Sequence, residues 1–178
     1  MLIPRQPVPR LALETLSSGT FDLSRDNPEF ATLVVFYRGL HCPICATYLK
    51  ELGGVSAEFL ESGVKTIAIS SDNESCARKM ADKVGYPELR VGYDLPLSVA
   101  KEWGLYLSSG RGTTSIGIEE PALFSEPGVF LVRKDCTLYF AIVQTMPFVR
   151  PHFKEMLGAL KFVQENNYPA RGEYTGPV

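Results

Sequence analysis

Two cysteines three residues apart, Cys42 and Cys45, place the strongest constraint on what this chain can fold into. The run Thr32 to Tyr37 just before them is short, β-branched and aromatic, which predicts a buried strand. Pro43 lies between the cysteines and suits the first turn of a helix, because the N–H that proline lacks would have no partner there. The sequence therefore predicts that the cysteine pair lies where a strand ends and a helix begins.

Such a junction favours thiol chemistry. A thiolate there meets unpaired backbone N–H groups and the positive end of the helix dipole, which stabilise its charge. Cys42 precedes the helix and is the better placed for exposure and nucleophilic attack. Cys45 lies on the stripe that faces the core, so we expect it to be more buried and to resolve a mixed disulfide. Arg38 and His41 are close in sequence and are expected to add positive potential.

Other uses of the two thiols fit less well. A structural zinc site needs four ligands, and the remaining candidates, Cys76, Cys136 and two histidines, form no second pair. A covalent c-type haem needs a histidine directly after the second cysteine, where this chain has Ala46. Two thiols that merely fill a core remain as the plain structural alternative. We expect neither a metal nor an organic cofactor, and the redox-active pair itself as the reactive group.

Length and charge narrow the function classes. The 178 residues suit a single domain, with residues 1–30 as an N-terminal extension, 31–166 as the core and 167–178 as a tail. The formal charge is −2 and the 18 Lys and Arg are scattered, which does not favour nucleic-acid binding. The longest apolar runs are far shorter than the roughly 20 residues of a membrane-spanning helix. Residues 1–10 contain no apolar signal segment, so we expect a cytoplasmic protein without membrane contact.

The hydrophobic pattern predicts a mixed sheet flanked by helices. After the helix that begins at Pro43, a second strand is expected, and a second helix from a Ser71–Glu74 capping box to Gly85. A third helix is expected over residues 96–103, ending at the core residue Trp103, and a last helix begins at Pro151. The expected strands are a short edge strand at 21–23, the strands 32–37 and 64–70, and a hairpin of 128–132 with 137–143.

Several segments together resemble one protein family. The run VVFYRGLHCPIC looks like the active-site segment of thioredoxin-fold proteins in the peroxiredoxin-like (AhpC/TSA) group, in particular members with Arg-Gly-x-x-Cys-Pro-x-Cys. The resemblance extends from about residue 11 to 172 and includes IAISSD at 67–72, residues 94–104, PGVFLVR at 127–133 and YPARG at 168–172. It implies an α/β, thioredoxin-like three-layer sandwich, with a mixed β-sheet flanked by helices and an N-terminal peroxiredoxin-like extension.

The family pattern leaves two reactions open. A typical peroxiredoxin has Pro-x-x-x-Thr-x-x-Cys, which would make Cys45 the peroxidatic residue, but Arg38 and Cys42 stand where the Pro and Thr would be. The family's later active-site Arg would fall near Pro127, which instead resembles the substrate-binding cis-proline position of thioredoxin-like reductases. The resemblance thus favours a thiol-disulfide oxidoreductase that uses Cys42 and Cys45. The alternatives are a thiol peroxidase that acts through Cys45 and a non-enzymatic redox-sensing module.

These possible functions imply several partners, and they give Cys76, Cys136 and His152 no catalytic role. The expected partners are a protein or small-molecule disulfide or a hydroperoxide as substrate, a thiol electron donor, and a second copy of the chain in a homodimer. Cys76 is predicted to be a half-buried packing thiol, Cys136 an exposed thiol in a hairpin turn, and His152 a surface residue. The loop-like stretch 111–124 is expected to border a substrate groove or a dimer contact.

Overall fold

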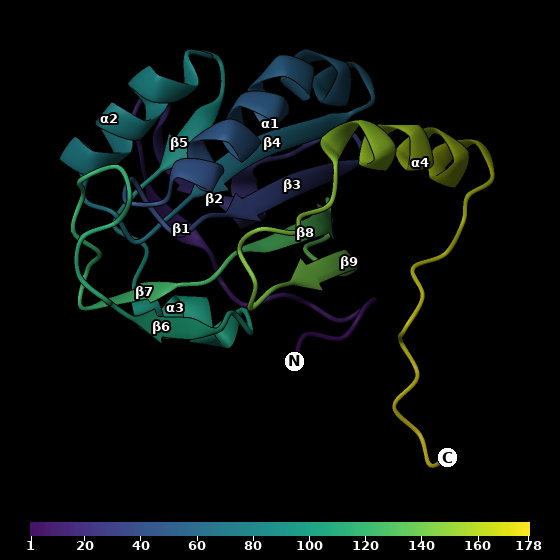
Figure 1. Ribbon diagram of the computed structural model, residues 1–178. Helices are drawn as coiled ribbons and strands as arrows, with labels where there is room; N and C mark the ends of the chain where they lie inside the picture. The colour runs from purple at the N-terminus through teal and green to yellow at the C-terminus, as the bar shows by residue number, and fades with distance from the viewer.

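The computed structural model describes residues 1–178 and contains one large mixed sheet (Figure 1). Seven strands follow one another across it in the order β2 (Gly19–Asp22), β1 (Ala12–Thr15), β5 (Arg90–Gly92), β4 (Val64–Ile69), β3 (Ala31–Phe36), β8 (Gly128–Arg133) and β9 (Leu138–Val143). The central strands β3, β4 and β5 are parallel, whereas β8, β9, β1 and β2 pair in antiparallel fashion. The predicted α/β sandwich with a mixed sheet is confirmed.

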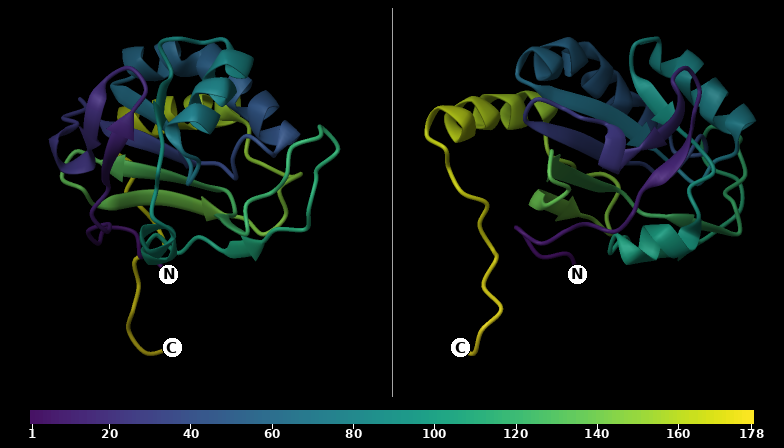
Figure 2. Two further views of the ribbon diagram at one scale, coloured as in Figure 1. Left: turned by 90° about the vertical axis from the view of Figure 1, so that its left-hand side faces the viewer. Right: turned by 180° about the vertical axis from the view of Figure 1, so that it is seen from behind.

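Helices cover both faces of this sheet (Figures 1 and 2). On one face lie α1 (Pro43–Glu61), α2 (Glu74–Val84) and α4 (Phe153–Glu165), and on the other α3 (Leu97–Glu102) with a small two-stranded sheet of β6 (Leu107–Ser109) and β7 (Leu123–Ser125). A 3₁₀ turn, η1 (Leu23–Arg25), follows β2. No helix has the length and apolar character needed to cross a membrane.

The central strand β3 shows why two helical layers are needed. All six of its residues are buried. Leu33 and Val35 pack under α1, α2 and α4, while Val34 and Phe36 pack on the opposite face with Trp103. A continuous apolar run rather than an alternating one is what a strand covered on both faces requires. Trp103 is fully buried, as its spacing predicts.

Local signals place most element ends correctly. The helix α1 begins at Pro43, and Gly63 and Gly85 adopt positive φ angles of 75° and 73° just after α1 and α2. The predicted hairpin is β8–β9, and Cys136 in its turn has a φ of 62°, where glycine would be less strained. It is partly buried rather than exposed.

The predicted capping box at Ser71 is wrong. The N-cap of α2 is Asn73, whose side chain accepts the N–H of Cys76 at 3.0 Å. Asn is as good an N-cap as Ser, and its position two residues later leaves Ser71 outside the helix. The sequence pattern also gave no sign of β1, β5 or β6, and it placed β7 partly inside the predicted loop 111–124. These strands have only three or four residues each, too few for a period-two pattern to stand out.

Candidate functional site

The cysteine pair lies at the predicted junction. Cys42 is the N-cap residue of α1, directly after the turn that follows β3. Its N–H donates to the carbonyl of Gly39 at 3.1 Å, and its own carbonyl accepts the N–H of Cys45 at 3.1 Å. Both thiols are free, so the pair is a dithiol. Sequence reasoning therefore placed both sulfurs at the start of the correct helix.

Their exposure differs from the expectation. Cys42 is only 2% exposed and Cys45 is fully buried, so the predicted exposure of Cys42 is wrong. The reason lies beyond β9, where the chain folds back against the start of α1 before α4 begins. Residues 144–152 of this returning segment bring a side chain of their own to the two sulfurs.

That side chain is Arg150, which the sequence reasoning missed. Its Nη2 lies 3.2 Å from the Sγ of Cys45 and 3.9 Å from the Sγ of Cys42. The guanidinium stacks over the ring of Tyr48 at 5.0 Å, and its Nε donates to the carbonyl of Pro147 at 2.9 Å. No local pattern marks Arg150, because more than a hundred residues separate it from the cysteines along the chain.

The helix α1 anchors the segment that carries Arg150. The Tyr48 hydroxyl donates to the carbonyl of Pro151 at 2.9 Å. The N–H of Phe153 donates to Glu51 at 2.8 Å, and Nδ1 of His152 lies 3.5 Å from the same carboxylate. His152 is largely exposed, as predicted. The first two turns of α1 thus carry the cysteines and also hold the arginine that faces them.

The two thiols differ in acidity. Hydrogen bonding from the Cys45 side chain, with further help from its backbone N–H, Arg150 and Arg38, lowers the pKa of Cys42 to about 6, although burial opposes this. Burial raises the pKa of Cys45 well above the ordinary value, and the neighbouring Cys42 adds to that effect. Cys42 is therefore the more acidic of the two thiols, and Cys45 holds its proton more tightly.

Arg38 has other partners besides the dithiol. Its Nη2 lies 3.3 Å from Glu120, its Nε lies 3.4 Å from Glu126, and its guanidinium stacks on Phe124 at 4.6 Å. These contacts join the end of β3 to the segment 111–126, which contains the predicted loop 111–124. Two carboxylates share the charge of Arg38, so its effect on the Cys42 pKa ranks below that of Arg150.

His41 does not supply a positive charge at neutral pH. Its ring is buried against Phe124, with the ring centres 4.6 Å apart. Burial first, and then the charge of Arg38, lowers the pKa of His41 to about 4. The expectation that His41 adds positive potential beside Cys42 is therefore corrected, because the imidazole is neutral at pH 7.

Pro43 and Pro127 both lie near the end of β3 that leads to the dithiol. Pro43 is the first residue of α1. Pro127 is buried directly before β8, whose Gly128 pairs with Phe36 at the end of β3 that leads to the dithiol. The peptide bond before Pro127 is trans, unlike the reductase position that it resembles in sequence. Its carbonyl accepts the N–H of Gln144, where the segment carrying Arg150 begins.

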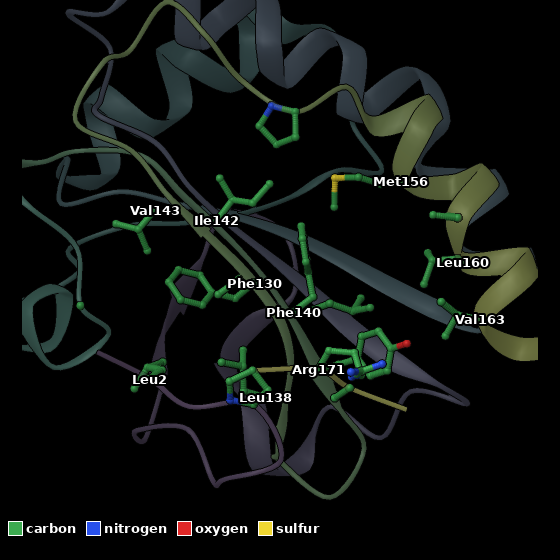
Figure 3. Close-up of a pocket in the computed structure, with 18 of the residues that line it drawn as sticks. Leu2, Phe130, Leu138, Phe140, Ile142, Val143, Met156, Leu160, Val163 and Arg171 are labelled. Carbon is green, nitrogen blue, oxygen red and sulfur yellow. The ribbon is translucent and has the colours of Figure 1, made fainter. Parts of the chain in front are cut away.

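A large groove lies elsewhere on the molecule (Figure 3). It measures about 1010 Å³, and 18 of its 25 lining residues are apolar. Figure 3 shows Phe140 and Ile142 of β9 facing Met156 and Leu160 of α4 across it. Neither cysteine lines this groove, so a choice of the site by cavity size alone would miss the dithiol. A smaller hollow of about 320 Å³ is lined by Arg150, Tyr48 and Ile44, and Arg150 also contacts both sulfurs, although neither cysteine lines the hollow itself.

The remaining cysteines lie apart from the pair. Cys76 is half-buried in the first turn of α2, and Cys136 lies in the β8–β9 turn. Burial raises the pKa of both thiols, which makes each less reactive than Cys42. No cluster of three or more His, Cys, Asp or Glu side chains has an arrangement that could hold a metal ion.

Comparison with known proteins agrees with this architecture. The sequence profile of the AhpC/TSA family matches residues 4–141. The chain belongs to the AhpC/TSA family. That membership, together with the dithiol, assigns it to the thiol redox proteins, while leaving the particular reaction open. No curated protein sequence matches the chain.

Solved structures similar to this AhpC/TSA chain include a peroxidoxin, an AhpC and a putative thiol:disulfide interchange protein. The peroxidoxin BcpB of Mycobacterium tuberculosis has a TM-score of 0.70 and 18% identity, with 92% of this chain and 99% of that one covered. AhpC of Enterococcus faecalis has a TM-score of 0.71 and 16% identity, with coverage of 99% and 100%. A putative thiol:disulfide interchange protein DsbE of Chlorobium tepidum has a TM-score of 0.64 and 19% identity, with coverage of 92% and 98%. At these identities the likeness establishes a shared fold.

Proposed function

We propose that this AhpC/TSA protein is a thiol-disulfide oxidoreductase that cycles Cys42 and Cys45 between dithiol and disulfide. The observation that carries the proposal is the position of Cys42 at the N-cap of α1, beside the Cys45 thiol and within reach of Arg150. These groups favour a thiolate at Cys42 and leave a protonated thiol beside it to complete the exchange.

The reaction has two balanced steps. The Cys42 thiolate attacks one sulfur of a substrate disulfide, which forms a mixed disulfide and releases the other sulfur as a thiolate that takes up a proton. Cys45 then loses its proton and attacks Sγ of Cys42, which forms the Cys42–Cys45 disulfide and releases the second substrate thiol. The substrate gains two electrons, and a thiol electron donor returns two electrons to the protein.

Access to Cys42 depends on the segment 144–152. Because Cys42 is only 2% exposed, a disulfide reaches its sulfur only when the segment that carries Arg150 shifts away from α1. The small hollow beside Arg150 and Tyr48 is the proposed entry. Because the segment must move for either substrate, a small disulfide should need a smaller displacement than a polypeptide disulfide.

Neighbouring residues have supporting roles in this proposal. Arg38 adds positive charge and ties the segment 111–126 to the site. His41 supports the turn before Cys42 as a neutral, packed ring. Pro43 fixes the first turn of α1, and Pro127 shapes the wall of the site at the start of β8.

A trapping experiment tests the order of attack. Reduced wild type, Cys42→Ser, Cys45→Ser and, as a matched control, Cys76→Ser are incubated with a small disulfide and with insulin. Cys45→Ser is expected to hold a mixed disulfide through Cys42, and Cys76→Ser to reduce insulin like the wild type. If Cys45→Ser accumulates no adduct at Cys42, the assignment of the nucleophile is wrong.

A peroxidase is the second candidate, and the short contact between Arg150 and Cys45 favours it. In that reaction the Cys45 thiolate attacks a hydroperoxide oxygen, which forms a sulfenic acid and releases an alcohol or water. Cys42 then condenses with the sulfenic acid to the same disulfide and releases water. Peroxide consumption that survives in Cys42→Ser with an external thiol, but is lost in Cys45→Ser, supports this reaction over disulfide exchange.

The cellular setting forms part of the proposal. We place the activity in the cytoplasm, where a thiol donor keeps the pair reduced. A very low reduction potential with slow exchange would instead mark a redox-sensing module.

A homodimer is the proposed assembly, because β9 is an edge strand and faces the apolar groove of Figure 3. Light scattering that shows the mass of one chain at micromolar concentration would reject the dimer.

A further inference from the structure

Asp72 is a buried acid with an unusual set of contacts. It lies just after β4, the parallel neighbour of β3, so both strands end at the same edge of the sheet. Its Oδ2 accepts the backbone N–H of Leu40 at 2.8 Å, and this hydrogen bond is buried. Its own N–H donates to the Ser70 hydroxyl at 3.2 Å, and its carbonyl accepts the N–H of Asp94 at 2.7 Å. The backbone of Asp72 is therefore held by Ser70 and Asp94, and its carboxylate is held by Leu40.

The turn above this carboxylate is packed closely against it. Gly39 has a φ of 139°, a conformation that other residues rarely adopt. A Cβ at Gly39 would lie 2.7 Å from Oδ1 of Asp72 and 3.0 Å from Nδ1 of His41. The turn therefore has no room for a side chain at position 39, and its backbone follows the surface that Asp72 presents.

The same turn sets the position of the nucleophile. The carbonyl of Gly39 accepts the N–H of Cys42 at 3.1 Å, which makes Cys42 the N-cap of α1. We propose that Asp72 is a positioning residue for Cys42, because its hydrogen bond to Leu40 holds the 39–41 turn that delivers the thiol to the start of the helix. This role rests on Cys42 being the nucleophile of the proposed function.

The charge of Asp72 does not explain such a role. A carboxylate near the site would oppose a second negative charge on Cys42, and its charge raises the pKa of the neighbouring Tyr37 and Cys76. Positioning and simple electrostatics therefore predict shifts of opposite sign when the side chain is removed. That difference in sign makes the role testable apart from effects on folding.

The experiment measures the alkylation rate of Cys42 by iodoacetamide against pH, with the modified cysteine identified by tandem mass spectrometry of the peptide. The variants are Asp72→Ala, which removes the acceptor, and Asp72→Asn, which keeps an acceptor oxygen without the charge. Gly39→Ala disturbs the turn from the other side. Asp26→Ala is the matched control, since Asp26 is also a buried acid but binds Arg90 and Thr32 instead.

Asp72→Ala is expected to slow alkylation of Cys42 by about fivefold at pH 6, which corresponds to an increase of about one unit in its pKa. Gly39→Ala should act in the same direction, while Asp72→Asn and Asp26→Ala should stay within about twofold of the wild type. Faster alkylation in both Asp72 variants, or no change in either, would overturn the positioning role alone. A wild type whose Cys42 is no more reactive than Cys76 would overturn the proposed nucleophile, and the role of Asp72 with it.

Discussion

At the scale of single residues, two arginines from different parts of the chain lower the pKa of Cys42, and their other contacts determine which of them has the larger effect. Arg38 is next to the site in sequence but binds two carboxylates, Glu120 and Glu126. Arg150 is remote in sequence, stacks on Tyr48, and directs its Nη2 at both sulfurs. A charge that carboxylates already neutralise acts weakly on a third group, so Arg150 should contribute more to the acidity of Cys42.

Replacement of Arg150 tests this ranking. We expect Arg150→Ala to raise the pKa of Cys42 above its value of about 6, and by more than Arg38→Ala does. The measurement is a pH titration of thiolate absorbance near 240 nm on the reduced protein. Arg133→Ala is the control, because Arg133 stacks on Phe30 and Tyr139 instead. A larger increase in Arg38→Ala than in Arg150→Ala would contradict the geometry.

Asp72 also gives a prediction for stability. Burial raises its pKa to about 6 from an ordinary value of 3.8. A raised folded-state pKa means that the stabilising, protonated form is complete below about pH 4 and is lost as the pH rises through 6. Asp72→Asn, which cannot ionise, should therefore unfold at a higher denaturant concentration than the wild type at pH 8, by on the order of 1–3 kcal/mol.

The control for that prediction has the opposite sign. Burial alone would raise the pKa of Asp26, but the hydrogen bonds and charge of Arg90 outweigh it and lower the pKa. Asp26→Asn should therefore destabilise the protein at pH 8, with the difference shrinking as the pH falls below 4. Denaturant unfolding at pH 3 and pH 8 gives both results. Equal effects of the two substitutions at pH 8 would show that the pKa assignments are wrong.

At the scale of elements, the contact between α1 and the end of α2 explains a pair of glycines that helix propensity disfavours. Gly53 and Gly54 each weaken the interior of α1 by about 1 kcal/mol relative to alanine. The structure gives the reason at Gly53, where an added Cβ would lie 2.5 Å from the Tyr86 ring. At Gly54 a Cβ would lie 3.3 Å from the Tyr86 hydroxyl, the free end of a partly exposed side chain. The two glycines are therefore not equivalent.

Alanine substitutions at Gly53 and Gly54 distinguish the effect of close packing against Tyr86 from the effect of helix propensity. Gly53→Ala should lower the free energy of unfolding by about 1–3 kcal/mol, because the ring or the helix must shift to make room. Gly54→Ala should be neutral or stabilising by up to about 1 kcal/mol, since Tyr86 can move its hydroxyl. Thermal unfolding of both variants beside the wild type provides the measurement. A loss of stability in Gly54→Ala as large as that in Gly53→Ala would exclude this explanation.

Elements whose signals are local were predicted well, and those that depend on distant partners were not. Pro43 and Gly63 mark the two ends of α1 because proline and glycine restrict the backbone at their own positions. Ser71 fits the capping-box pattern with Glu74, but Asn73 is also a good cap, and only the folded backbone shows which one reaches Cys76. The strand β5 is stable because β4 and β1 flank it, which three residues of sequence do not reveal.

The candidate site divides in the same way. Cys42, Cys45 and their place at the start of a helix follow from spacing and a single proline. Arg150 and Asp72 reach that place only because the segment after β9 folds back on α1 and because β4 ends beside β3. The burial of Cys42 could not be predicted for the same reason, since the returning segment causes it.

At the scale of the whole molecule, the N-terminal segment lies beside the start of the C-terminal tail, and the tail then extends away from the body of the protein (Figure 2). Arg5 joins them, because its backbone N–H donates to the carbonyl of Leu138 in β9 while its side chain reaches the C-terminal tail. The Nε of Arg5 donates to the carbonyl of Ala170 at 2.9 Å, and its Nη2 lies 3.2 Å from Glu173. The Tyr139 hydroxyl of β9 also donates to the carbonyl of Tyr168 at 2.9 Å, so Arg5 provides the attachment of the tail beyond that residue.

Removal of that side chain should free the tail without unfolding the domain. The ion pair with Glu173 is partly exposed and screened by solvent, so Arg5→Ala should change global stability little. Hydrogen exchange of peptides that cover residues 168–173 should become faster, while β3 and β4, which lie in the centre of the sheet, keep their protection. Arg10→Ala, which changes an exposed arginine in the same segment, should leave the tail unchanged. If the tail exchanges equally fast in the wild type and in Arg5→Ala, the contacts of Arg5 do not hold it, and the hydrogen bond from Tyr139 and the apolar contacts of Ala170 must do so instead.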